Sequence, residues 1–153
     1  MIEDRLLQVA NELSRRTGRR PREAFMRRAV STAYYAMFHA LARLCADQLI
    51  GGIHVRTMAW GRVYRALDHK AAKTTMRSAE GAELAPAIAA FGEAFAVLQE
   101  RRIQADYDPV PFRYYFNETS SLIDLARTAI EGLNSLGPDE RRALTALLLF
   151  RQR

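Results

Sequence analysis

The amino-acid sequence predicts an all-α protein, an up-and-down bundle of about five to six helices with one long central helix. Apolar residues recur at steps of three and four along most of the chain, which is the period of helices that bury one face. No segment shows the alternation of apolar and polar residues that is typical of a strand. The 153 residues are 49% hydrophobic and contain no repeat, so we expect one domain over residues 1–153.

The first two predicted helices cover residues 2–16 and 21–50. Gly18 ends the first helix, and Pro21 suits the first turn of the second, which stops at Gly51-Gly52. A helix of about 30 residues is long for a globular protein, so we expect it to be the spine of the bundle. The residues expected to face inward are Leu6, Val9, Ala10 and Leu13 in the first helix and Val30, Tyr34, Met37, Leu41 and Leu44 in the second.

The remaining elements follow from the same signals. We expect a third helix over 58–70, a connecting loop over 71–83 and a fourth helix from Pro86 to Tyr107, where Asp108-Pro109 breaks the pattern. A fifth helix is predicted over 118–136 and stops at Gly137-Pro138, and a last helix follows from Asp139. The aromatic residues between 112 and 116 have two interpretations, a plug in the core or a surface that stacks on bases, and we favour the plug.

Composition limits the class of protein. The net charge is +6, and many arginines lie close together, which suits phosphate backbones or an acidic partner but also a solvated turn. Neither a signal peptide nor a membrane-spanning run is recognisable, and the single cysteine, Cys45, is expected to be a core residue, so we expect a cytoplasmic protein. Metal or cofactor motifs are not found either. The clustered arginines are Arg15, Arg16, Arg19, Arg20, Arg22, Arg27 and Arg28.

A charged pair interrupts the apolar face of the fourth predicted helix. Continuing the line through Ile88 and Phe95 at about 100° per residue brings Arg102 and Asp106 to within roughly 20° of it. An aspartate in the last turn also faces the negative end of the helix dipole. Charges at core positions are unfavourable unless they are paired, and such a pair often marks a site. The alternative is a simple intrahelical ion pair, and Arg101 is a neighbouring candidate for binding phosphate.

A polar stripe follows one side of the long helix. Arg28, Thr32, Tyr35 and His39 are spaced at four, three and four residues, so they share a face. They form either a wall of donors that meets Asp106, a phosphate or a base, or a set of buried groups that satisfy one another. His54 follows the Gly51-Gly52 turn and could join the same cleft, whereas we expect His69 to cap the end of the third helix.

Two segments together resemble the HEPN superfamily of small helical bundles. The run from Arg28 to His39 (Arg-Ala-Val-Ser-Thr-Ala-Tyr-Tyr-Ala-Met-Phe-His) is similar to the long-helix signature of small prokaryotic HEPN proteins. The run from Arg102 to Tyr107 is similar to their Arg-x-x-Ala-Asp-Tyr motif, and His54 falls where that group tends to carry a histidine. The resemblance covers about residues 2–133.

The resemblance implies a homodimer formed through the long helices, with a cleft at or near the interface. Many HEPN proteins are metal-independent ribonucleases of toxin–antitoxin or phage-defence systems, some pair with a nucleotidyltransferase antitoxin, and others only bind RNA or a nucleotide. Their nuclease motif places a histidine four to six residues after an arginine, and this chain has none there. Asp106 is not a simple replacement, since an ordinary carboxylate is a weak base at pH 7.

Two functions therefore remain as hypotheses. In the first, the chain binds RNA or a nucleotide, and cleavage stays open: Arg102 and Arg101 hold phosphate, Asp106 orients Arg102 or a histidine, and His39 or His54 supplies the base. Tyr35, Tyr107 and Arg28 then line the cleft. In the second, the chain is a non-enzymatic module that pairs with a nucleotidyltransferase. Neither hypothesis involves a membrane.

Overall fold

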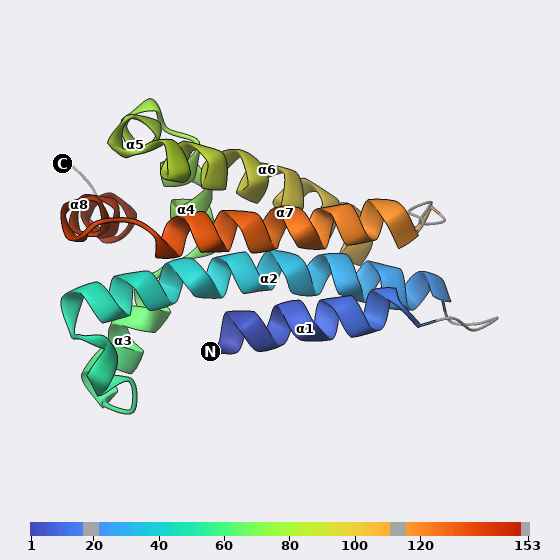
Figure 1. The fold of residues 1–153 in the computed structure, drawn as a ribbon, viewed down its shortest axis with the longest axis horizontal. Helices are drawn as coiled ribbons and strands as arrows, with labels where there is room; N and C mark the ends of the chain where they lie inside the picture. The colour runs from blue at the N-terminus through green and yellow to red at the C-terminus, as the bar shows by residue number, and fades with distance from the viewer. Residues whose placement is uncertain (17–21, 111–115, 151–153) are drawn as a thin grey trace.

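The long helix α2 (Arg22–Leu49) is the centre of the structure (Figure 1). The computed structural model describes residues 1–16, 22–110 and 116–150, so Pro21 and the arginines at 19 and 20 lie outside it, as do the aromatic residues at 112, 114 and 115. Helices α1 (Ile2–Ser14), α6 (Pro86–Tyr107) and α7 (Phe116–Asn134) pack along α2. The described part of the chain is all-α, as predicted, and contains no strand.

Short helices close one end of this arrangement. The 3-10 turn η1 (Gly52–His54) leads from α2 into α3 (Met58–Ala66), and α4 (His69–Met76), α5 (Ala79–Leu84) and α8 (Pro138–Leu149) follow. Figure 1 shows α8 almost along its axis, across the end of the bundle near α4 and α5. None of the described helices is both long and apolar enough to cross a bilayer.

Two short helices replace the loop predicted over 71–83, so the described residues form eight α-helices and the expected number was too low. Asp68 accepts a hydrogen bond from the Ala71 amide (2.7 Å) and so begins α4. Ser78 does the same for α5 through the Gly81 amide (3.0 Å). Side-chain oxygens at these N-cap positions satisfy amides that have no partner within the helix.

Most of the predicted core is confirmed. All five residues of the α2 stripe and the α6 residues Ile88, Phe91, Phe95 and Leu98 are buried, and Cys45 is buried with them. The α1 prediction is wrong at Val9, which is 44% exposed, because α1 presents a face containing Glu3, Leu7 and Ala10 instead.

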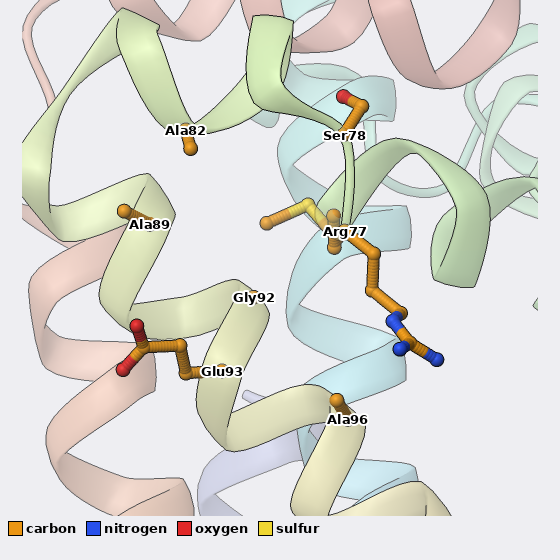
Figure 2. Close-up of a pocket in the computed structure, with 8 residues that line it drawn as sticks. Arg77, Ser78, Ala82, Ala89, Gly92, Glu93 and Ala96 are labelled. Atoms are coloured by element: carbon orange, nitrogen blue, oxygen red, sulfur yellow. The ribbon is translucent and has the colours of Figure 1, made fainter.

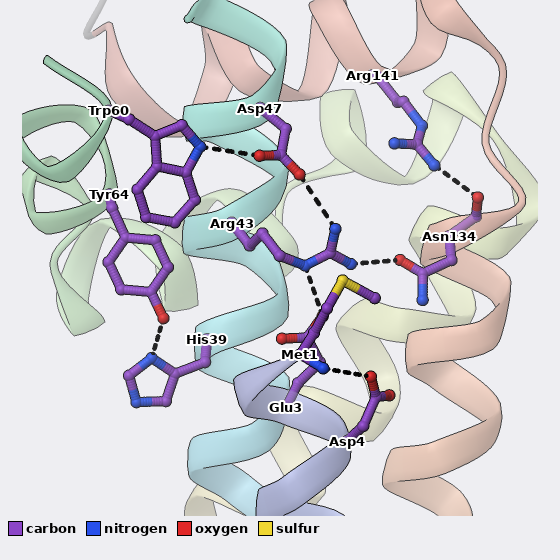
Figure 3. Close-up of polar contacts among 10 residues, drawn as sticks. All are labelled: Met1, Glu3, Asp4, His39, Arg43, Asp47, Trp60, Tyr64, Asn134 and Arg141. Carbon is purple, nitrogen blue, oxygen red and sulfur yellow. Dashed lines mark hydrogen bonds and ion pairs between the residues drawn. The ribbon is translucent and has the colours of Figure 1, made fainter. Parts of the chain in front are cut away.

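A buried ion pair holds α1 in that orientation (Figure 3). Glu3 is fully buried, and its Oε1 accepts a hydrogen bond from Arg43 Nε of α2 (2.5 Å). The same guanidinium contacts Asp47 (3.1 Å) and donates to Asn134 Oδ1 (3.0 Å), so it also joins α2 to α7. Glu3 Oε2 is buried without a hydrogen-bond partner among the described residues, so the charge of Glu3 depends on Arg43.

Removing Arg43 should therefore destabilise the fold strongly. We expect Arg43→Met to lower the free energy of unfolding by about 3 kcal/mol, because Glu3 is left as an uncompensated buried charge. Glu3→Gln combined with Arg43→Met should recover much of that loss, and chemical denaturation measures both. Arg142→Met is the control, since it breaks an exposed pair with Asp139 and should change nothing measurable. Equal losses of unfolding free energy in Arg43→Met and Arg142→Met would contradict this account.

A very close approach brings α4 against α6 (Figure 2). A Cβ atom built on Gly92 of α6 would lie 2.1 Å from the Met76 carbonyl oxygen at the end of α4. No real side chain fits at that distance, so only glycine allows this contact. The two segments also line an open groove of about 300 Å³ whose other lining residues are Arg77, Ser78, Ala82, Ala89, Glu93 and Ala96.

Two glycine substitutions test this contact against each other. Gly92→Ala should lower the free energy of unfolding by about 2 kcal/mol, because backbone must move to relieve the overlap. Gly132→Ala on α7 should be neutral or stabilising by up to about 1 kcal/mol, since its new Cβ meets only Ala87 Cβ at 3.6 Å. Thermal or urea unfolding measures both, and a neutral Gly92→Ala would show that α4 does not need this close approach.

Candidate functional site

Arg102 is the centre of the candidate site. It lies in the last turns of α6, where the helix reaches the middle of α2, and its Nη2 donates to the Tyr35 hydroxyl oxygen (2.7 Å). Its guanidinium carbon lies 5.7 Å from the ring centre of Tyr34, 5.4 Å from that of Tyr35 and 5.5 Å from that of Tyr107. Three aromatic rings at such distances stabilise a cation through their quadrupoles. The guanidinium is thus held as a charge in a fixed place.

Asp106 holds Arg102 from its own helix. Arg102 Nε lies 2.9 Å from Asp106 Oδ2, but its N–H does not point at that oxygen, so the contact is an ion pair rather than a linear hydrogen bond. Ser31 of α2, which is buried, donates its hydroxyl to the same oxygen (3.1 Å). With 20% and 16% of their side chains exposed, the two charged residues sit at the edge of the core. This i,i+4 contact fits both sequence-based interpretations, the simple intrahelical ion pair and an Asp106 that orients Arg102.

The environment keeps Arg102 charged. Burial would lower the pKa of its guanidinium, but the hydrogen bond and charge interaction with Tyr35 and the carboxylate of Asp106 outweigh burial and raise that pKa. Apart from Tyr35 and Asp106, no described residue forms a hydrogen bond or an ion pair with the guanidinium of Arg102. A guanidinium has five N–H groups, so several remain for a ligand at the exposed edge.

His69 borders the same cluster from α4. Its Nδ1 forms a hydrogen bond with the hydroxyl of the buried Tyr34 (2.8 Å), and its ring stacks on Phe38 with the centres 3.9 Å apart. The prediction that His69 caps the end of the third helix was wrong, because the Asp68 N-cap makes His69 the first residue of α4. An aspartate directly before a helical pattern is the signal that reveals this start.

Two opposite pKa shifts mark the Tyr34–His69 pair. Burial, followed by the positive charge of Arg102, lowers the pKa of His69 below 6.5, so its imidazole is neutral at pH 7. Burial raises the pKa of Tyr34 to about 12, so its phenol keeps its proton. The site therefore combines a permanent cation, a neutral imidazole and a neutral phenol. The sequence analysis did not include Ser31, Tyr34 or His69 among the site residues.

The other predicted site residues lie outside the Arg102 cluster or at its margin. Arg101 is rotated by about 100° around α6 and donates to Gln104 Oε1 (3.1 Å), so Arg102 is the arginine that joins the cluster. Arg28 is exposed on α2, on the same side of that helix as Tyr35 and about two turns before it. His54 is exposed in η1, beyond the end of α2, and that end is itself about 21 Å along the helix axis from Tyr35.

His39 belongs to a second polar network rather than to the Arg102 cluster (Figure 3). Its Nδ1 forms a hydrogen bond with the Tyr64 hydroxyl, and the Tyr64 ring stacks on Trp60 with the centres 4.9 Å apart. Trp60 Nε1 donates to Asp47 (2.9 Å). Asp47 also contacts Arg43, so these hydrogen bonds continue to the Arg43–Glu3 pair. Burial lowers the pKa of His39. The network fastens α3 to α2, so the polar stripe of the long helix divides between two clusters.

One arginine of the basic cluster has a structural role. Arg27 donates through Nη1 to the carbonyl oxygens of Gln104 (3.2 Å), Ala105 (2.9 Å) and Asp108 (2.9 Å). A cation at the C-terminal end of a helix satisfies carbonyls without a helical partner and complements the dipole. Arg27 therefore positions the end of α6, where Arg102 and Asp106 lie.

Comparison with known proteins does not assign a family, because no family model, no curated protein and no solved structure matches the chain. In the described part of the chain, no three His, Cys, Asp or Glu side chains gather closely enough to hold a metal ion. Cys45 is not a candidate nucleophile, since burial raises the pKa of its thiol to about 12.

The influence of Arg102 on His69 can be measured directly. In Arg102→Ala the pKa of His69 should rise towards 6.5, because a neighbouring positive charge and part of the burial are removed. Titration of the imidazole by NMR follows this change. Arg101→Ala is the matched control, since it removes the same charge one residue away and should leave the pKa of His69 in place. The same shift in both variants would mean that net charge, not contact with Arg102, sets this pKa.

Proposed function

We propose that the chain binds RNA or a nucleotide, with Arg102 as the residue that holds a phosphate. The observation that carries this proposal is the fixation of the guanidinium between Tyr35, Asp106 and three aromatic rings, with N–H groups left at an exposed edge. A planar guanidinium that is already oriented loses little conformational entropy when it binds a phosphate through two hydrogen bonds. His69, which borders the same cluster, adds an imidazole nitrogen as a further polar group.

The surroundings of Arg102 suit a nucleotide better than a free inorganic anion. Tyr107 borders the cluster and is 69% exposed, so its ring is accessible to a base. Stacking of a base on an aromatic side chain is tolerant of sequence and contributes about 1–3 kcal/mol. Arg28, exposed on the same side of α2, and the net charge of +6 favour the approach of a polyanion.

We also propose that the chain is a HEPN protein and that it forms a homodimer. The two quoted segments, 28–39 and 102–107, supply Ser31, Tyr34 and Tyr35 on one side of the cluster and Arg102, Asp106 and Tyr107 on the other. The strip of α2 with Arg28, Thr32, Tyr35 and His39 is exposed or half-buried, so a second copy has access to it. A homodimer through α2 would place two Arg102 clusters near one interface, as expected for a HEPN-type toxin or defence protein.

A second function, docking to a partner such as a nucleotidyltransferase, has one observation in its favour. The turn after α2 exposes a cluster of apolar side chains, with Ile53 90%, Met58 80% and Val55 51% exposed. Exposed apolar residues gathered in one segment often mark a protein contact. Co-purification with the product of the neighbouring gene distinguishes this function, since a tight complex that is insensitive to Arg102→Ala would support docking alone.

Binding of single-stranded RNA tests the first function. Arg102→Ala should raise the dissociation constant at least about tenfold at low salt and reduce the slope of log K against log salt by about 1. Arg142→Ala, on α8, removes the same charge far from the cluster and should have little effect. Fluorescence anisotropy with a labelled oligonucleotide gives both constants, and circular dichroism confirms folding. Unchanged binding by folded Arg102→Ala would overturn the proposal.

A further inference from the structure

We propose that the turn after α2 and the outer face of α3 form a docking surface for an anionic phospholipid membrane. The residues of this surface, which we call the α3 surface, are three exposed aliphatic side chains and three exposed arginines, Ile53, Val55, Met58, Arg56, Arg62 and Arg65. None of them belongs to the Arg102 cluster, so the proposal does not depend on the proposed function. It also goes beyond the two sequence-based hypotheses, neither of which involves a membrane.

The aliphatic side chains of the α3 surface stand out from a hydrogen-bonded turn. The exposed fractions are 90% for Ile53, 80% for Met58 and 51% for Val55. The turn is closed by hydrogen bonds from His54 N to Gly51 O (3.0 Å) and from Thr57 N to His54 O (2.9 Å). Figure 1 shows it projecting from the bundle below α2, on the side away from α6 and α7. A turn that holds three aliphatic side chains in water is typical of a contact site.

Helix α3 has one face fastened to α2 and one face free. The inner face carries Trp60 and Tyr64, whose side chains form hydrogen bonds with residues of α2 (Figure 3). Met58, Arg62 and Arg65 follow one another at steps of four and three residues, so they share the opposite face. All three are exposed. The contacts of the inner face therefore hold a methionine and two arginines side by side towards solvent.

The positive charge of the α3 surface is not balanced nearby in the sequence. Residues 48–67 contain three arginines, Arg56, Arg62 and Arg65, and neither an aspartate nor a glutamate. Within the described part of the chain, no carboxylate forms an ion pair with any of the three. A Cβ atom built on Gly61 would lie 3.3 Å from Arg65 Nη1, so this guanidinium lies back towards the start of α3. The arginines thus favour an anionic partner beside the aliphatic side chains.

Two features favour a lipid surface over other anionic partners. Aliphatic side chains do not stack on bases as aromatic rings do, so bound RNA would leave them in water. They also project from a turn, and a lipid surface accepts projecting side chains of any shape, whereas a protein must offer a matching pocket. Aliphatic side chains enter the boundary between headgroups and acyl chains, and arginines are attracted to anionic headgroups. The α3 surface combines both kinds of group on one side of one helix.

Sedimentation with lipid vesicles tests the proposal. We expect the protein to bind vesicles of equal parts phosphatidylglycerol and phosphatidylcholine, more weakly as salt rises, and to bind pure phosphatidylcholine much less. Ile53→Ser combined with Met58→Ser should weaken binding at least about tenfold, because two side chains no longer leave water on binding. Arg62→Ala combined with Arg65→Ala should also weaken binding at least about tenfold, since two attractive charges are lost.

Matched substitutions on other helices are the controls. Val97→Ser removes an exposed aliphatic side chain from α6, and Arg142→Ala removes an exposed arginine from α8. Both variants should bind the vesicles like the wild type. Arg102→Ala should do so as well, whereas the Ile53→Ser/Met58→Ser variant should keep the RNA affinity of the wild type. Failure of the membrane proposal is therefore distinguishable from failure of the proposed function. Circular dichroism confirms that each variant is folded.

The outcomes separate a membrane from other partners. Binding that requires anionic lipid and is weakened in both double variants supports the proposal. A wild type that does not bind the anionic vesicles overturns it and leaves the aliphatic side chains to a protein partner. Binding that is lost in Arg62→Ala/Arg65→Ala but kept in Ile53→Ser/Met58→Ser overturns it too, since it is adsorption by charge alone. Loss of RNA affinity in Ile53→Ser/Met58→Ser would assign the α3 surface to RNA instead.

Discussion

Burial of α2 on several sides is the constraint on which the other contacts depend. A 28-residue helix is about 42 Å long, and α1, α6 and α7 all pack along it. Six alanines of α2 have at most 1% of their surface exposed, which lets the neighbouring backbones come close. Because so much of α2 is covered, its polar side chains meet other helices instead of water. They are stable only where those helices supply partners.

The two main ion pairs of the protein meet this requirement in different ways. Arg43 contacts Glu3 of α1, Asp47 of α2 and Asn134 of α7, so its hydrogen bonds hold these helices together. Arg102 has partners on one side and an exposed edge on the other. Each of the three guanidinium nitrogens of Arg43 contacts a protein oxygen, whereas Nη1 of Arg102 has no such partner among the described residues and so remains available to a ligand. This difference is why Arg102, and not Arg43, is the centre of the candidate site.

Three helices, α2, α4 and α6, contribute to the site, and local contacts place the ends of α4 and α6. Arg27 caps the end of α6, where Arg102 and Asp106 lie, and Asp68 begins α4 at His69. Gly92 lets the end of α4, at Met76, come close to α6. An arginine, an aspartate and a glycine outside the site therefore set its geometry. Their substitution would disturb the site without touching a ligand.

The sequence was sufficient for the all-α class, the long helix, the ends of α6 and most of the core. These features depend on the spacing of apolar residues and on glycine and proline at helix ends, which act locally. The pairing of Arg102 with Asp106 was also visible, because both residues lie on one helix one turn apart. The short helices α4 and α5 were missed, since their polar composition hides two ordinary N-caps, Asp68 and Ser78.

The contacts that each polar residue makes with other helices could not be inferred from spacing along the chain. His39 and Tyr35 share a helix face, yet one meets Tyr64 of α3 and the other Arg102 of α6. His69 looked like a helix cap but borders the Arg102 cluster. Whether Arg101 or Arg102 enters the cluster depends on a rotation of about 100° around α6, which local pattern leaves undetermined. Contacts between helices depend on how whole faces pack together, and that information is spread over the entire chain.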